Sequence, residues 1–229
     1  MTDGTAATTT WRELAVARSL DSARTRAENR VQRFLDAALE LMEVNDGKEF
    51  TVQEVVERSG QSLRSFYQYF GGKHELLLAL FEESVRATAD HLRVEVAKQE
   101  TPLDQLHAFV VGYYAICRPA SKSKGAKRAP TPSPTPVLVE FAQQLLTAHP
   151  ADAALAYVPL VSLFGELLDA AVESGDVRSD VRRQSTTGIV LEMISFNAFS
   201  AAIAGETGKR DRDEAAEEIW QLLFGGIGA

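Results

Sequence analysis

The polar side chains best suited to form specific hydrogen bonds lie on one short segment and at its two ends. The stretch "SLRSFYQY", Ser62 to Tyr69, places arginine, glutamine, serine and tyrosine within about two helical turns. Arginine can bond bidentately to guanine and glutamine to adenine, while serine and tyrosine suit phosphates or base edges. Residues on either side could clamp backbone phosphates. The candidate DNA-contacting residues are Thr51, Ser62, Leu63, Arg64, Ser65, Tyr67, Gln68, Tyr69 and Lys73.

Three helices are expected to position these side chains. Apolar residues at helical spacing predict a first helix over roughly Arg24 to Val44, with Thr25 and Glu28 as a capping box. A second capping box, Thr51 with Glu54, opens a short helix that Gly60 ends. Ser62 can cap a third helix that stops before Gly71 and Gly72. Two short helices joined by a glycine-containing turn, with a longer helix packed across them, describe a helix-turn-helix.

The stretch "TVQEVVERSGQSLRSFYQYFGGKHELLLALF", Thr51 to Phe81, resembles the DNA-binding signature of TetR-family (tetracycline-repressor-like) bacterial transcription regulators. The resemblance covers roughly residues 28 to 85. It implies that Arg64, Ser65, Tyr67 and Gln68 face bases or the groove. Thr51, Tyr69 and Lys73 then take phosphate-contacting positions; the alternative for Tyr67 and Tyr69 is that they only pack the module.

Three positions depart from the family pattern. Val56 and Ser59 stand where alanine is usual, and Gln61 stands where an apolar valine commonly fills the turn. These departures concern local packing.

The net charge of −8 argues at first against a nucleic-acid partner. Between Trp11 and Phe34, however, there are six arginines against three acids. The N-terminal part therefore carries local positive charge, and most of the acidity lies beyond Glu75.

The rest of the chain reads as helical, so the predicted fold class is all-α: a helix-turn-helix module followed by a helical core. A long helix follows from Lys73, and Thr101-Pro102 starts another that runs to about Cys117. Later helices are predicted at about 137–148, 153–174, 181–204 and 214–224. Between them, residues 118–136 hold five of the eight prolines and five basic residues with no acid, which predicts a mobile loop. This loop is either a solvated connection or an auxiliary phosphate contact.

These elements give three predicted regions. Residues 1–23 form an N-terminal arm expected to be flexible, 24–72 a DNA-binding domain, and 73–229 a ligand-binding and dimerisation domain.

The resemblance implies that the last two long helices pair across a two-fold axis and that the core binds a small effector. Apolar residues suited to the pairing faces are Ile189, Met193, Phe196, Ile219, Trp220 and Leu223. Bulky residues that could line an effector cavity, or simply fill the core, are Phe109, Tyr113, Phe141, Leu145, Tyr157, Phe164, Leu168 and Phe196. Tyr114 belongs to the same group. An apolar lining favours a hydrophobic effector.

Two polar residues in this region have alternative roles. Asn197 either forms a hydrogen bond in the core or contacts the effector, and His107 is either a polar anchor in the cavity or a partly buried histidine.

Other function classes find little support. The sequence has no GxGxxG, P-loop, GxSxG or HExxH motif, so no enzyme activity is expected. The lone Cys117 and the spacing of the histidines predict neither a disulfide nor a metal site, and no cofactor is implied. No apolar run reaches the roughly 18 residues of a membrane span, so a cytoplasmic protein is expected.

The function that these features favour is a homodimeric repressor, released from a pseudo-palindromic operator in double-stranded DNA by a small hydrophobic effector. The alternative is a helical ligand-binding or adaptor protein that keeps the helix-turn-helix only as scaffold.

Overall fold

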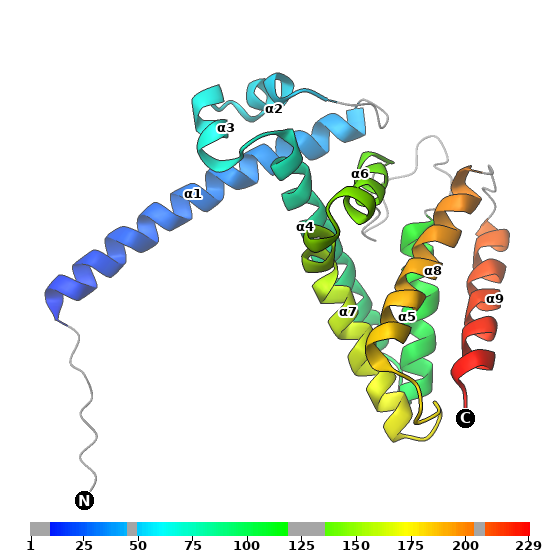
Figure 1. Ribbon diagram of the computed structural model, residues 1–229. Helices are drawn as coiled ribbons and strands as arrows, with labels where there is room; N and C mark the ends of the chain where they lie inside the picture. Colours follow the sequence, from blue (N-terminus) through cyan, green and yellow to red (C-terminus); the bar gives the residue numbers. More distant parts are fainter. Residues whose placement is uncertain (1–9, 45–49, 119–135, 204–208) are drawn as a thin grey trace, which may run out of the picture. The chain divides into compact units, whose positions relative to one another are not determined.

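The computed structural model describes residues 10–44, 50–118, 136–203 and 209–229, which form nine α-helices and no β-strand (Figure 1). The all-α prediction is confirmed. The helices are α1 (Trp11–Val44), α2 (Val52–Ser59), α3 (Leu63–Tyr69), α4 (Lys73–Val96), α5 (Pro102–Cys117), α6 (Pro136–Ala148), α7 (Pro150–Glu173), α8 (Arg183–Ile203) and α9 (Lys209–Ile227). The chain divides into two compact units between Leu77 and Leu78, within α4.

The first unit is built around an aromatic cluster. Phe34 of α1 meets Phe66 of α3 edge to face at 5.4 Å between ring centroids, and Phe70 at 6.1 Å. All three rings are buried, and Val55 and Val56 of α2 are buried in the same unit. This contact holds α3 against the long first helix and fixes which side of α3 faces outward.

The caps expected from the sequence set the short helices. Thr51 accepts a hydrogen bond from the Glu54 amide, and the Glu54 carboxylate accepts one from the Thr51 amide, which completes the capping box. Gly60 ends α2 at φ +64°, a left-handed conformation that favours glycine. Ser62 then accepts from the Ser65 amide and begins α3. Gly60 thus produces the tight turn of the helix-turn-helix.

Helix α1 begins earlier than the sequence indicated. It starts at Trp11 rather than near Arg24, so residues 11–23 of the expected flexible arm are helical, while residues 1–9 lie outside the described part. The Thr25 hydroxyl donates to the Asp21 carbonyl one turn earlier at 3.0 Å, so Thr25 lies inside the helix instead of capping it. Residues 11–23 contain no glycine or proline, and nothing there interrupts the helix.

The second unit is organised around α5, which packs against α7, α8 and α9, while α6 packs on α7 (Figure 1). Thr101 caps α5 by accepting from the Asp104 amide, as the Thr-Pro pair predicts. Gly112 allows α4 to approach α5 closely, because a Cβ there would lie 2.9 Å from Leu92 Cδ2.

The later helix bounds lie within a few residues of the prediction, except at the start of α9. That helix begins at Lys209 rather than near Glu214. The predicted loop at 118–136 falls almost entirely on residues 119–135, which lie outside the described part. Among the described helices, α7 alone is long and apolar enough to cross a membrane. Core helices of soluble proteins commonly pass the same test. In α7, Leu160, Phe164 and Leu168 are buried in the second unit.

Candidate DNA-contacting module and effector cavity

The third helix presents a polar face to solvent. Its own Phe66 points inward and is fully buried, while Arg64 and Gln68 are exposed and Tyr67 is 56% exposed. Leu63, which could have faced the core, is 43% exposed. A helix this short, anchored by one aromatic ring and exposing arginine, glutamine and tyrosine together, has the shape and chemistry to enter a major groove.

The other candidate DNA-contacting residues differ in their exposure and in the contacts that they already make. Ser62 is exposed at the helix start, whereas Tyr69 is half-buried. Ser65 is also half-buried, and its hydroxyl oxygen has no hydrogen-bond partner within the described residues. Lys73 is half-buried and lies over the Phe50 ring, with 5.0 Å from Nζ to the centroid. Their contact with DNA stays a prediction.

Thr51 is engaged in the capping box that the sequence predicted. Its hydroxyl and amide both donate to Glu54 Oε2, at 2.8 and 2.7 Å. These bonds, the one from the backbone first, hold the pKa of Glu54 below its usual value. The carboxylate therefore stands at the start of α2, where the sequence led us to expect a phosphate.

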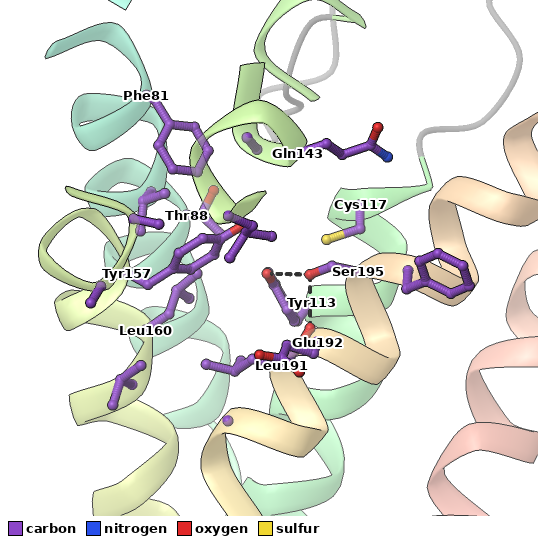
Figure 2. A pocket seen from close by; sticks show the side chains of 18 of the residues that line it. Phe81, Thr88, Tyr113, Cys117, Gln143, Tyr157, Leu160, Leu191, Glu192 and Ser195 are labelled. Carbon is purple, nitrogen blue, oxygen red and sulfur yellow. Dashed lines mark hydrogen bonds between the residues drawn. The ribbon is translucent and has the colours of Figure 1, made fainter. Parts of the chain in front are cut away.

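The second unit contains a partly open cavity of about 890 Å³. Five helices line it, α4 to α8, and Figure 2 shows their side chains converging from several sides. Most are apolar: they include Phe81 and Val85 of α4, Leu138 of α6, Leu160 of α7 and Ile189 of α8. This volume is large enough for a small-molecule ligand.

A polar cluster lies on the α5 and α8 side of the cavity (Figure 2). The Tyr113 hydroxyl lies 2.9 Å from Ser195 Oγ, and Ser195 Oγ donates to the Leu191 carbonyl at 2.8 Å. Because a serine hydroxyl has one hydrogen, Tyr113 must be the donor to Ser195. The Cys117 thiol lies close to both of them and lines the same cavity.

These groups carry no charge at neutral pH. Burial raises the pKa of Cys117 to about 12 and also raises the pKa values of Tyr113 and Tyr157. Among the described residues that line the cavity, Glu192 is the one acidic residue, and there is no lysine, arginine or histidine. The cavity can thus offer hydrogen bonds but has little to hold an anion.

The structure brings only part of the predicted ligand set to the cavity. Tyr113, Tyr157 and Phe196 line it. Phe109 and Phe164 are fully buried and pack on each other at 5.1 Å. Phe141 packs at 6.4 Å from Phe81, behind the lining. Leu145 and Leu168 are also buried outside it. These five residues pack in the core of the second unit.

Sequence reasoning missed Thr88, Cys117 and Ser195. Thr88 had a signal: it interrupts the apolar series Phe81, Val85 and Leu92 on the inner face of α4, and it is only 5% exposed. A buried polar residue in an apolar series often serves a ligand or a hydrogen bond.

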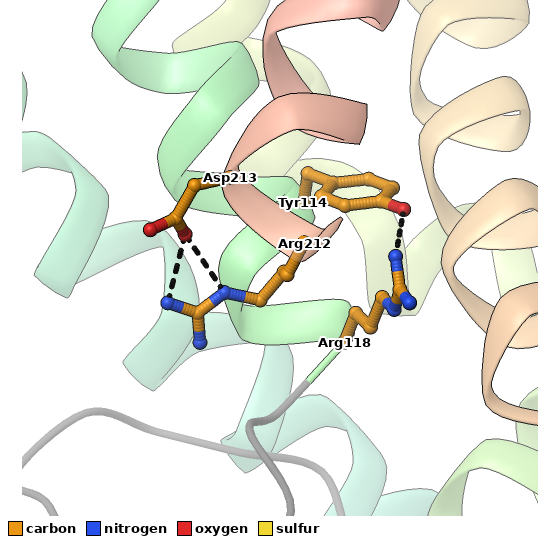
Figure 3. Close-up of polar contacts among 4 residues, drawn as sticks. All are labelled: Tyr114, Arg118, Arg212 and Asp213. Atoms are coloured by element: carbon orange, nitrogen blue, oxygen red, sulfur yellow. Dashed lines mark hydrogen bonds and ion pairs between the residues drawn. The ribbon is translucent and has the colours of Figure 1, made fainter. Parts of the chain in front are cut away.

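Asn197 forms a hydrogen bond in place of lining the cavity. The Tyr114 hydroxyl donates to Asn197 Oδ1 at 3.2 Å and accepts from Arg118 Nη1 at 3.1 Å. Figure 3 shows Arg118 at the end of α5 reaching this hydroxyl, with Arg212 bonded to Asp213 on α9. Arg118 is only 3% exposed, and this chain of bonds gives its buried guanidinium one hydrogen-bond partner while it links α5 to α8.

His107 also lies away from the cavity. Its Nε2 is 2.9 Å from Glu217 Oε2, and its ring meets Trp220 edge to face at 5.0 Å. It therefore joins α5 to α9, and the reading as a partly buried histidine fits this position.

Comparison with known proteins relates part of the chain to a protein family. The profile described as "Bacterial regulatory proteins, tetR family" matches residues 34–80, the segment that holds α2, α3 and their anchoring phenylalanines. The HTH-type transcriptional regulator BetI of Brucella anthropi is 25% identical over 97 residues, which are 42% of this chain and 50% of BetI. The chain spans about half the length of the curated relatives it matches.

Solved structures share the fold across most of the chain. FadR from Bacillus subtilis, solved with stearoyl-CoA, superposes with a TM-score of 0.60 at 14% identity over 86% of this chain and 98% of FadR. Thermus thermophilus FadR, a TetR-family transcriptional repressor solved with lauroyl-CoA, gives a TM-score of 0.62 at 22% identity over 84% and 92%. Residues 34–80 therefore match the tetR family of bacterial regulatory proteins, and most of the chain shares the fold of solved TetR-family regulators.

Proposed function

We propose that the protein is a cytoplasmic homodimeric repressor that binds a pseudo-palindromic operator and is released by a small apolar effector. The observation that carries the proposal is the pairing of two features in one chain: an α3 that exposes Arg64, Tyr67 and Gln68, and a separate cavity of about 890 Å³.

The cavity supports an uncharged effector. The FadR proteins of similar fold bind acyl-CoA molecules, whose phosphates call for cationic partners. The described lining residues here supply tyrosine, serine, threonine and thiol groups and no cation. An apolar molecule with a hydroxyl or carbonyl group that meets Tyr113 or Ser195 fits this chemistry.

Replacing one arginine on α3 tests the DNA-binding part. With duplexes that the wild-type chain selects from a random-sequence pool, Arg64→Ala should cost about 1 to 3 kcal/mol and relax base preference. Lys73→Ala should weaken all duplexes alike and lower the slope of log affinity against log salt by about one.

Arg93→Ala is the matched control, because Arg93 is an exposed arginine in the second unit and pairs with Asp90. Fluorescence anisotropy measures all three. If the Arg64 variant bound the selected and unselected duplexes just as the wild type does, α3 would not be the recognition helix.

A further inference from the structure

The first two-thirds of α1, from Arg12 to Arg33, carries a one-sided arrangement of charge. At about 100° per residue, Arg12, Arg26, Arg30 and Arg33 fall within about 60° of one another around the helix. Asp21 and Glu28 lie on nearly the opposite side, about 160° away. We name the set Arg12, Arg26, Arg30 and Arg33 the arginine stripe. All four side chains are exposed.

Arg24 marks the other side of the helix. Its Nε bonds to Glu28 Oε1 at 2.7 Å, and this hydrogen bond is the main reason that its pKa is raised. The positive charge of Arg24 is therefore compensated by a neighbour on its own face. The stripe leaves its charge on the side of α1 that faces away from these acids.

The stripe lies next to the DNA-contacting module. Arg30 and Arg33 are within about one turn of Phe34, whose ring contacts Phe66 of α3. From there the stripe runs toward the N-terminus for about 32 Å, the length of 21 helical residues. Figure 1 shows this part of α1 extending beyond α2 and α3 within the first unit. It also lies outside the family match, which begins at residue 34.

We propose that the arginine stripe binds the phosphate backbone of DNA beyond the base pairs that α3 contacts. This inference rests on the proposed function, because it takes DNA as the partner. A duplex carries one negative charge for about every 1.7 Å of its axis, so a row of guanidinium groups along one side of a helix is complementary to it. Guanidinium groups also bond bidentately to phosphate.

The acidic face favours DNA over a lipid surface as the partner. A helix that lies in a membrane interface carries lysine and arginine across its polar face. In α1 the apolar side includes Val16 and Leu20, with the stripe on one edge and Asp21 and Glu28 on the other. Anionic lipid would meet those acids, whereas a duplex approached from the stripe side would not.

The test is a triple variant, Arg26→Gln with Arg30→Gln and Arg33→Gln, against the single variant Arg24→Gln. Both keep helix-forming side chains at exposed positions, so circular dichroism should be unchanged. The probe is a duplex selected by the wild-type chain, extended on both sides with mixed sequence. We expect the triple variant to lose about two to three units of salt slope for each bound protomer and at least about ten- to a hundredfold in affinity, because each phosphate contact contributes about 0.9 to the slope.

Arg24→Gln should bind as the wild type does. The extension should matter too: trimming the duplex to the segment protected around α3 should weaken the wild type and leave the triple variant unaffected. Equal slopes for the wild type, the triple variant and Arg24→Gln would overturn the inference while leaving the proposed function intact. A wild-type chain that binds no duplex would overturn both. Binding of the wild type to phosphatidylserine-rich vesicles that the triple variant loses, with unchanged DNA binding, would assign the stripe to a membrane instead.

Discussion

Single side chains decide what the cavity can accept. Tyr113 is hydrogen-bonded to Ser195 close to the Cys117 thiol, and burial raises the pKa of both the tyrosine and the thiol, which stay protonated. A ligand that brought a carboxylate or phosphate to this cluster would meet donors without a compensating positive charge, and Glu192 would repel it. The same groups can bond a neutral hydroxyl or carbonyl at little cost.

The raised pKa of Cys117 predicts a loss of stability in alkali. Its pKa is about 12 in the folded protein and 9.0 in its ordinary state, so between these values only the unfolded chain releases the proton. The contribution of the protonated thiol to the free energy of unfolding is complete below about pH 9 and is lost as the pH rises toward 12. From about pH 8 to pH 10, this thiol should lower the free energy of unfolding by about 1 kcal/mol.

Urea denaturation of Cys117→Ala at both pH values measures this contribution. The variant should show a smaller loss than the wild type, and the remainder should reflect Tyr113 and Tyr157, whose pKa values are also raised. An equal loss in both proteins would mean that the thiol ionises as easily in the folded state as in the unfolded one.

The helices were largely predictable from sequence, whereas the cavity lining was not. Caps such as Thr51 with Glu54, and Gly60 after α2, act between residues a few positions apart, so the sequence carries them directly. The cavity lining depends on how each helix is rotated against its neighbours, because this rotation decides which of the large side chains on α5 to α7 face the cavity. Phe109 and Phe164 fill the core against each other, and Cys117 and Ser195 come together from residues far apart in the chain.

The last two helices show the same limit. Ile219, Trp220 and Leu223 of α9, expected on a pairing face, are buried within their own unit, and Trp220 packs on His107 and Phe224. The apolar side chains that α8 and α9 leave exposed include Ile189, Phe196 and Leu222. A charged residue at Trp220 would therefore damage the protomer itself.

Dimerisation is better tested at exposed positions of these helices. Phe196 and Leu222 are 71% and 72% exposed, so Phe196→Glu and Leu222→Glu should each fold normally. If the two helices pair between protomers, burying the new charge should weaken the dimer at least tenfold. Light scattering over a concentration series reports the assembly state.

Leu155→Glu on α7 is the control, since Leu155 is 69% exposed and lies outside the predicted face. Loss of the dimer in this variant alone would move the interface to α7. A wild-type chain that stayed monomeric at micromolar concentration would contradict the homodimer.

Taken as a whole, the chain has one helix common to its two units. Leu76 and Leu77 of α4 belong to the first unit, and Phe81, Val85 and Thr88 line the cavity in the second. A ligand that prefers one arrangement of α4 can therefore change the population of states that bind DNA, but only by its difference in affinity between those states. That difference sets the size of the response, and an apolar compound that fills the cavity equally well in both states would leave DNA binding unchanged.

Coupling between cavity and DNA should accordingly be reciprocal. We expect a neutral apolar compound, found by screening for a raised melting temperature, to weaken DNA binding by about 5- to 150-fold, a coupling of about 1 to 3 kcal/mol. Saturating DNA should weaken the compound's binding by the same factor, as measured by calorimetry on both arms of the cycle. Thr88→Val gives a matched control, because it keeps the shape of a cavity-lining side chain and removes its hydroxyl; binding of a compound that bonds this hydroxyl should fall while DNA affinity without the compound stays the same. If compounds across a broad apolar library raised the melting temperature and none changed DNA affinity over a full titration, the cavity would bind ligands without controlling the operator.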